Sequence, residues 1–368
     1  MNPFFIFGTL FRYFAFYYTR WILLCLFGLA IIISVIQSVE LMRQKSVNKS
    51  DVQEVSVSVL AMLNLPNIIE VILPFAVLIG TMLCFNAWNK SNEFIVTRGF
   101  GQSIWLSLSP VLVSALAIGI FFVMVINPIG AVTSKRYDSQ MATLNGDRSN
   151  NLTISESGIW LRDMQDDVKI IINGDALNMK TAQISNPAIY SFVNGFELNW
   201  RVQAQSMQLT QMGWEVVDGT KWDSDGLKND LGTFIIPTNL EAVDLTRSGQ
   251  SPHSISIYAL PYFINVLERA GLPTINHEIH FNKILAFPLL LVGISMIAAR
   301  ITVRSINRGR QMRLVIKGLG IATCVFIFSY LMHVMGTSLT VPAVVAGWTP
   351  AIAVFLIGSI MLARLDEN

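Results

Sequence analysis

One charge-free run near the end of the chain sets the fold class. Residues 318–363 contain no Asp, Glu, Lys or Arg. As a single helix this run would reach about 70 Å, whereas the apolar core of a bilayer is about 30 Å thick. The run must therefore turn back on itself, and Gly336-Thr337-Ser338 together with Pro342 provide the break. The pattern predicts two membrane-spanning helices joined by a short turn.

Four further apolar stretches raise the predicted number of spans to six. They cover residues 21–39, 71–89, 99–134 and 284–299. A hydrophobic content of 52% with only 14% charged residues is typical of a membrane protein. The first stretch follows a basic start, as a signal peptide does, but its apolar run is too long and no small-residue cleavage pattern follows it. We expect a retained anchor.

The basic residues predict the orientation of these spans. Most of them lie in short segments that six spans place on one side of the membrane, and the preference of Lys and Arg for the cytoplasm assigns that side and both termini to it. An exception follows the first span, where Arg43, Lys45 and Lys49 fall on the outer side. The cytoplasmic positions are Arg12, Arg20, Lys90, Arg98, Arg300, Arg304, Arg308, Arg310, Arg313, Lys317 and Arg364.

The middle of the chain has a different pattern. Short runs that alternate apolar and polar residues, as at 158–162 and 168–172, predict strands, and Asn173-Gly174 and Asp218-Gly219 predict turns between them. No cysteine falls in this region, so no disulfide framework is expected. We predict a helical membrane protein with three spans in residues 1–127, a periplasmic all-β, jelly-roll-like domain in 128–276, and three spans in 277–368.

A short polar segment between the second and third spans points to a partner. Residues 89–100 are too few for a domain, but they suffice for about two turns of helix on the cytoplasmic surface. Such a helix can receive a push from a soluble protein. The chain has no G-x-x-x-x-G-K-[ST] run for binding ATP and no catalytic constellation. We therefore expect no enzyme activity and no cofactor in this chain.

Several motifs, in this order and spacing, resemble the LptF/LptG family of lipopolysaccharide export permeases over almost the whole chain. Within the family the chain is most similar to the LptG branch of the alphaproteobacterial type, with the LptF branch as the alternative. The motifs are residues 65–66, 73–80, 92–101, 127–128, 158–162, 260–261, 286–290 and 346–350.

The resemblance implies a subunit of an ABC transporter in the bacterial inner membrane. Such a subunit pairs with LptF, and an LptB dimer binds ATP below the pair. The complex extracts lipopolysaccharide from the membrane and passes it through β domains to LptC and then LptA. No nucleic acid is expected as a partner, because membrane topology and anionic lipids explain the basic loop at 300–317.

The resemblance also gives roles to residues of the polar segment. Glu93, Phe94 and Arg98 would contact the ATPase, with Phe94 supplying apolar contact and Glu93 an ionic one. A solvated loop is the alternative. Thr97 and Phe100 replace the smaller residues that are usual in the family.

Four basic residues are candidates for binding the anionic head group of lipopolysaccharide. Arg43 and Lys45 follow the first span, and Lys135 and Arg136 follow the third. Phosphates of the lipid would attract cations at the top of a cavity. A solvated loop is again the alternative for the first pair, and a structural role for the second.

The remaining polar residues near the spans have mainly structural explanations. Glu40 and Glu70 are expected to be solvated at the interface or paired with the basic cluster. His333, inside the fifth span, is either a gate residue or an interhelical contact. His277-Glu278-Ile279-His280 resembles a metal motif, but it offers no third ligand and lacks the H-E-x-x-H spacing, so no metal is expected.

Two other classes of function compete with export. A mechanotransmission permease would move no lipid and would signal through its outer domain, but such proteins typically have fewer spans. A membrane-anchored enzyme or receptor is disfavoured by the missing catalytic residues.

Overall fold

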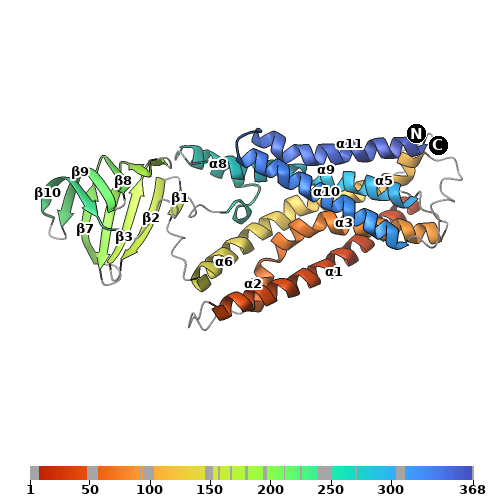
Figure 1. The fold of residues 1–368 in the computed structure, drawn as a ribbon, viewed down its shortest axis with the longest axis horizontal. Helices are drawn as coiled ribbons and strands as arrows, with labels where there is room; N and C mark the ends of the chain where they lie inside the picture. Colours follow the sequence, from red (N-terminus) through yellow and green to blue (C-terminus); the bar gives the residue numbers. More distant parts are fainter. Residues whose placement is uncertain are drawn as a thin grey trace.

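The computed structural model describes residues 8–47, 57–91, 93, 103–145, 152–155, 158–165, 168–178, 181–193, 197–210, 212–223, 226–238, 251–269, 272–303 and 311–366. A helical bundle forms one end of the molecule and a β domain the other, and both termini lie at the bundle end that is remote from the β domain (Figure 1).

The described residues contain six helical stretches that are long and apolar enough to cross a membrane, which confirms the predicted number. The stretches are Thr9–Arg43, Leu65–Lys90, Ile104–Met141, Ile275–Val303, Ile316–Thr337 and Ala343–Arg364. They belong to α1 (Thr9–Val47), α3 (Leu65–Lys90), α5 to α6 (Ile104–Asn145), α9 (Ile275–Val303), α10 (Gln311–Thr337) and α11 (Ala343–Asp366).

The turn predicted between the last two spans is confirmed. Helix α10 ends at Thr337 and α11 begins at Ala343. Leu339 adopts a left-handed conformation with φ of 58°, and the Thr340 amide donates to the Met335 carbonyl. This is the usual way for a helix to end, although glycine is the common residue at the left-handed position.

The third span is longer than the sequence suggested. Helix α5 (Ile104–Phe121) runs through a π-helical turn, η2 (Phe122–Ile126), into α6 (Asn127–Asn145) without a break. The end of this span was expected at residue 127, where the predicted β domain was taken to begin. The π-helical turn directly before Pro128 lets the helix continue, because such a turn compensates for the backbone N–H that proline lacks. The helix therefore occupies the first part of the region assigned to the β domain.

The ten described strands form one nearly closed antiparallel sheet inserted between the third and fourth spans, which confirms an all-β domain. The order is β1-β2-β3-β6-β7-β9-β8-β5-β4, with β10 paired to the other edge of β9. The two ends of the sheet approach each other where β4 contacts β2. The strands are β1 (Leu152–Ser155), β2 (Gly158–Gln165), β3 (Val168–Gly174), β4 (Ala176–Asn178), β5 (Gln183–Ser185), β6 (Ala188–Val193), β7 (Glu197–Gln203), β8 (Ser206–Thr210), β9 (Gly213–Asp223) and β10 (Lys228–Ile236).

One predicted turn in this domain is wrong. Asn173-Gly174 does end a strand, but β9 continues through Asp218-Gly219. The register between β9 and β10 shifts at Gly219, so the Asp-Gly pair forms a bulge instead of a hairpin. Asp218 has a φ of 54° there, a conformation that Asp tolerates better than most residues.

Glycines allow the helices of the bundle to approach one another closely. A Cβ atom on Gly293 of α9 would lie 2.7 Å from the backbone nitrogen of Phe355 in α11, and one on Gly119 of α5 would lie 2.5 Å from the Cα of Pro288 in α9. Glycine is needed where helix backbones approach this closely in a membrane. Helix α9 is therefore the centre of the bundle.

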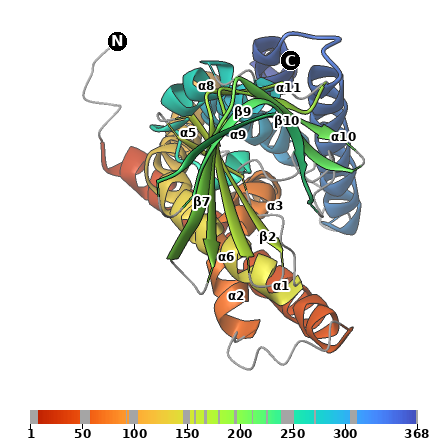
Figure 2. The same ribbon diagram turned by 90° about the vertical axis from the view of Figure 1, so that its left-hand side faces the viewer.

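The connection from the sheet back to the bundle is also helical in part. It contains η3 (Pro252–Ser254) and α8 (Leu260–Arg269). Leu267 of α8 is buried in the same cluster as the core of the sheet. Viewed from the β domain, α1, α6 and the short helix α2 (Val57–Leu63) lie to one side and α10 and α11 to the other (Figure 2).

Candidate functional site

An open apolar groove of about 870 Å³ lies between α1 and α3. Among the described residues that line it, only Ser34 and Ser38 carry polar side chains. Such a lining suits the alkyl chains of a lipid, whereas a charged group would lose its hydration there. The lining residues are Leu23, Leu26, Phe27, Ala30, Ile31, Ser34, Val35, Ser38, Val39, Met42, Leu65 and Ile69.

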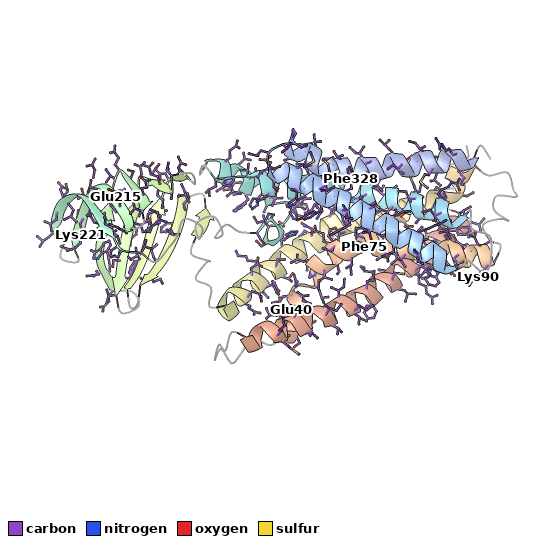
Figure 3. All side chains as sticks on the ribbon, in the orientation of Figure 1. Glu40, Phe75, Lys90, Glu215, Lys221 and Phe328 are labelled. Carbon is purple, nitrogen blue, oxygen red and sulfur yellow. The ribbon has the colours of Figure 1, made fainter. Side chains whose placement is uncertain are left out.

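Arg43 lies at the β-domain end of this groove, directly after the lining residue Met42. Its guanidinium donates two hydrogen bonds to the Glu40 carboxylate, at 2.7 and 2.9 Å. Glu40 marks this end of α1, and Lys90 marks the opposite end of the bundle (Figure 3). Of the two environments expected for Glu40, solvation or pairing with the basic cluster, the structure shows the pair. Because both side chains are exposed, the pair is weak and Arg43 can exchange partners.

The other basic candidates lie on neighbouring elements. Lys135 and Arg136 are exposed on α6. Lys45 is part of α1, but its side chain lies outside the described residues, as does all of Lys49.

The ends of α1, α2 and α6 pack together in one cluster of Leu41, Leu60, Tyr137 and Met141. The structure therefore brings the helix ends that carry Arg43 and Lys135 into one small region.

A second cavity, of about 470 Å³, lies among α3, α9, α10 and α11. Its deeper walls are apolar and include Phe75, Leu290 and Phe326. The end nearest the β domain carries the ionisable side chains. His333, the predicted gate residue, is exposed and lines this cavity from α10. The ionisable lining residues are Glu70, His253, His280, Lys283 and His333.

Glu70 is the centre of a charged cluster in that cavity. Its carboxylate is only 7% exposed, and one oxygen lies 3.0 Å from the Lys283 ammonium. The other oxygen lies 3.6 Å from Nδ1 of His253. Glu70 was expected to be solvated or to bind the basic cluster after the first span. That expectation is wrong, because Glu70 is buried and forms an ion pair with Lys283 of the fourth span.

Polar contacts dock the connection from the β domain onto the bundle. The side-chain oxygen of Asn127, at the start of α6, accepts a hydrogen bond of 2.9 Å from the buried backbone amide of Ile257. The Ser251 hydroxyl donates to Asp138 of α6 at 3.2 Å. His253, between these two points, reaches Glu70 of α3. Residues 251–257 therefore connect the sheet to two of the spans.

Only the first part of the predicted coupling segment is described. Glu93 is half-buried, and its carboxylate interacts with the Tyr13 hydroxyl of α1. The Asn89 side chain donates to the Thr302 carbonyl at 3.1 Å, which joins the end of α3 to the end of α9. Phe94 and Arg98 lie outside the described residues. The segment thus begins on a firmly packed end of the bundle.

The polar residues of the metal-like motif have separate environments. Glu278 accepts a hydrogen bond from Thr274, and His277 packs on Phe263 with ring centroids 5.4 Å apart. His280 instead faces His253, at a centroid distance of 4.4 Å.

Two neighbours of His280 were missed because they are remote from it in the sequence. Glu70 and His253 come from other elements, so the motif alone offered no third ligand. A charged residue in an apolar helix generally indicates a functional site, and Lys283 is such a residue. No pattern in the sequence indicated its pairing with Glu70.

Comparison with known proteins decides the family. A sequence model described as "Lipopolysaccharide export system permease LptF/LptG" matches residues 12–364. The chain belongs to the LptF/LptG family. It is also 24% identical over 350 residues, 90% of each chain, to the "Lipopolysaccharide export system permease protein LptG" of Haemophilus influenzae. This is a family of permeases and not of enzymes, and the six apolar helices fit a multi-pass protein of the inner membrane.

Proposed function

We propose that this chain is the LptG-type permease subunit of an ABC transporter that extracts lipopolysaccharide from the inner membrane. It would pair with LptF, and an LptB dimer would bind and hydrolyse ATP. The β domain would lie in the periplasm and deliver the lipid toward LptC and LptA. The name of the Haemophilus relative supports the LptG branch over the LptF branch.

The groove along α1 is the observation that carries this proposal. It offers an apolar surface along α1 from Leu23 to Met42, and Arg43 follows directly after it. Lys135 and Arg136 are exposed on a helix that packs with the same end of α1. A lipid with several acyl chains and a phosphorylated head fits this combination, with chains in the groove and phosphates near the cations.

The way α1 is held supports a role in lateral entry. Near its start, Tyr18 and Ile22 are completely buried against the bundle. Ile31 and Val35, which line the groove, are 49% and 59% exposed. At the other end Leu41 is buried against α2 and α6, so the exposed apolar stretch between these two contacts can face a lipid or a partner helix. The exposed apolar face of α10, with His333, offers a second such surface.

The start of the coupling segment supports transmission of movement. Asn89 connects α3 to α9, and Glu93 interacts with Tyr13 of α1. A push on residues 89–100 would therefore act on the first, second and fourth spans together. The charge distribution supports a cytoplasmic position for this end of the bundle.

Site-specific photocrosslinking in proteoliposomes tests the proposal. A photoreactive residue at Ile31 or Val35, in the groove, should crosslink to lipopolysaccharide, and ATP should lower the yield as the lipid is released. The same photoreactive residue at Leu356 of α11, which is 52% exposed and does not line the groove, is the matched control. Equal yields at the three positions, with no effect of ATP, would contradict the groove as the binding site.

The composition of the purified complex separates export from signalling. Copurification with a paralogous permease and a soluble ATPase dimer is expected for an exporter. A homodimer of this chain would favour the mechanotransmission alternative. If the groove crosslinks to a protein helix and not to lipid, it is a subunit interface.

A further inference from the structure

His280 is a buried imidazole with an unsatisfied nitrogen. The residue is 5% exposed, and its Nε2 atom has no hydrogen-bond partner among the described residues. A buried polar atom in this state costs free energy that a bond to the atom would recover. The ring packs edge-on against His253, so a second imidazole lies beside it.

Glu70 completes a set of three potential ligands. One ligand atom from each of Glu70, His253 and His280 can be chosen so that all three lie within 4.8 Å of one another. In a tetrahedral zinc site with bonds of 2.0–2.1 Å, ligand atoms are about 3.3 Å apart. His253 is 48% exposed and lies on a single turn of helix. A small inward movement of its side chain can therefore bring the three ligand atoms to the separation that zinc requires.

From this arrangement we infer that Glu70, His253 and His280 form a binding site for a divalent transition-metal ion, with zinc the best-fitting ion. Two imidazoles and one carboxylate are a recognised zinc ligand set, and borderline metals favour nitrogen ligands over the all-oxygen sets of Mg²⁺ and Ca²⁺. The site opens into the cavity between α3 and α9, which leaves room for water as the fourth ligand.

The position of the site gives the ion a structural task. Glu70 belongs to α3, His280 to α9 and His253 to η3, in the segment that returns from the β domain. A metal ion bound to all three would fasten residues 251–257 to two spans. It would add to the hydrogen bonds that this segment already makes with Asn127 and Asp138. This inference is independent of the proposed transport function.

Lys283 competes with the metal for Glu70. Its ammonium lies 3.0 Å from one carboxylate oxygen and adds positive charge beside the site. Its side chain is 48% exposed, so it can swing toward water when a metal binds. Replacing Lys283 by an uncharged side chain of similar length should therefore strengthen metal binding.

Spectroscopic titration tests the inference on the tag-free, full-length chain in detergent with the proteins that copurify with it. Co²⁺ is the probe, because tetrahedral Co²⁺ absorbs visible light and Zn²⁺ displaces it. The complex should bind one Co²⁺ per copy of this chain, and His253→Ala and His280→Asn should each weaken binding at least about tenfold. His333→Ala, in the same cavity but outside the cluster, should bind as the wild type does.

Thermal unfolding provides a second readout. Zn²⁺ should raise the melting temperature of the wild type but not of His253→Ala, because a ligand of the folded state stabilises only the protein that binds it. The rise should be larger for Lys283→Met, which leaves the buried carboxylate without its ammonium. The inference is overturned if the wild type binds no Co²⁺, if the two histidine variants bind it equally well, or if His333→Ala loses it too.

Discussion

The hydroxyl oxygens of Tyr18 and Ser295 lie 2.8 Å apart in a fully buried contact between the first and fourth spans. Thr81 of α3 donates a further hydrogen bond of 3.3 Å to the Tyr18 oxygen. Three helices therefore meet at one polar point inside an apolar core. Beyond this point α1 borders the groove, so the contact marks the end of that helix that is held in the core of the bundle.

We predict that Tyr18→Phe loosens the attachment of α1. Hydrogen bonds between membrane helices contribute on average about 0.6 kcal/mol and at most about 1.7 kcal/mol. A double-mutant cycle of Tyr18→Phe with Ser295→Ala, measured by reversible unfolding in mixed micelles, should give a coupling energy of that order. Tyr330→Phe, at an exposed tyrosine of α10, should leave stability unchanged. A coupling energy near zero would mean that packing alone holds the helix.

A second prediction concerns the start of the coupling segment. Glu93→Ala should lower the amount of lipopolysaccharide released per ATP hydrolysed, because it removes the carboxylate that interacts with Tyr13 and with any partner below. Tyr13→Phe should have a smaller effect in the same direction, since it removes only the contact within the chain. Lys317→Ala, an exposed charge on α10, is the control. Unchanged release by Glu93→Ala in reconstituted vesicles would contradict the coupling role.

The secondary structure was largely predictable because membranes and sheets impose simple patterns. A span must be apolar over its whole length and cannot exceed the bilayer by much, so the run at 318–363 divides into two helices on length alone. Alternation of residues likewise identified β2 and β3. The predictions failed where one short sequence pattern is compatible with two local structures. A proline such as Pro128 can end a helix or be accommodated by a π-helical turn, and Asp218-Gly219 can form a hairpin or a bulge.

The contacts between distant residues were not predictable. Glu70 and Lys283 are 213 residues apart, and nothing in the chain between them indicates that they meet. His253 lies in a polar linker where a histidine carries no signal. Asn127 was noted only as part of a motif, yet its side chain fixes the backbone at Ile257. Such contacts depend on how helices cross, which one sequence does not specify.

A third prediction concerns the basic residues at the end of the groove. Replacing Lys135 and Arg136 together by Glu should weaken crosslinking of lipopolysaccharide from Val35, since phosphates would meet negative charge there. The loss should shrink at high salt, which screens exposed charges. Lys317→Glu, at the opposite end of the bundle, should have no effect. An unchanged crosslink yield in the double variant would assign these residues a purely structural role.

The last prediction concerns the packing of α9 against α11. A Cβ atom on Gly293 would lie 2.7 to 2.9 Å from backbone atoms of Val354 and Phe355, which cannot rotate away as a side chain could. Gly293→Ala should therefore push the two helices apart and destabilise the bundle by about 1–3 kcal/mol.

Gly320→Ala is the matched control, because a Cβ atom at that position of α10 meets nothing within 4 Å among the described residues. Its stability should be equal to or above that of the wild type, since alanine restricts the unfolded chain more than glycine does. Thermal unfolding of the two variants in one detergent distinguishes the cases, and equal melting temperatures would show that α11 can move without cost.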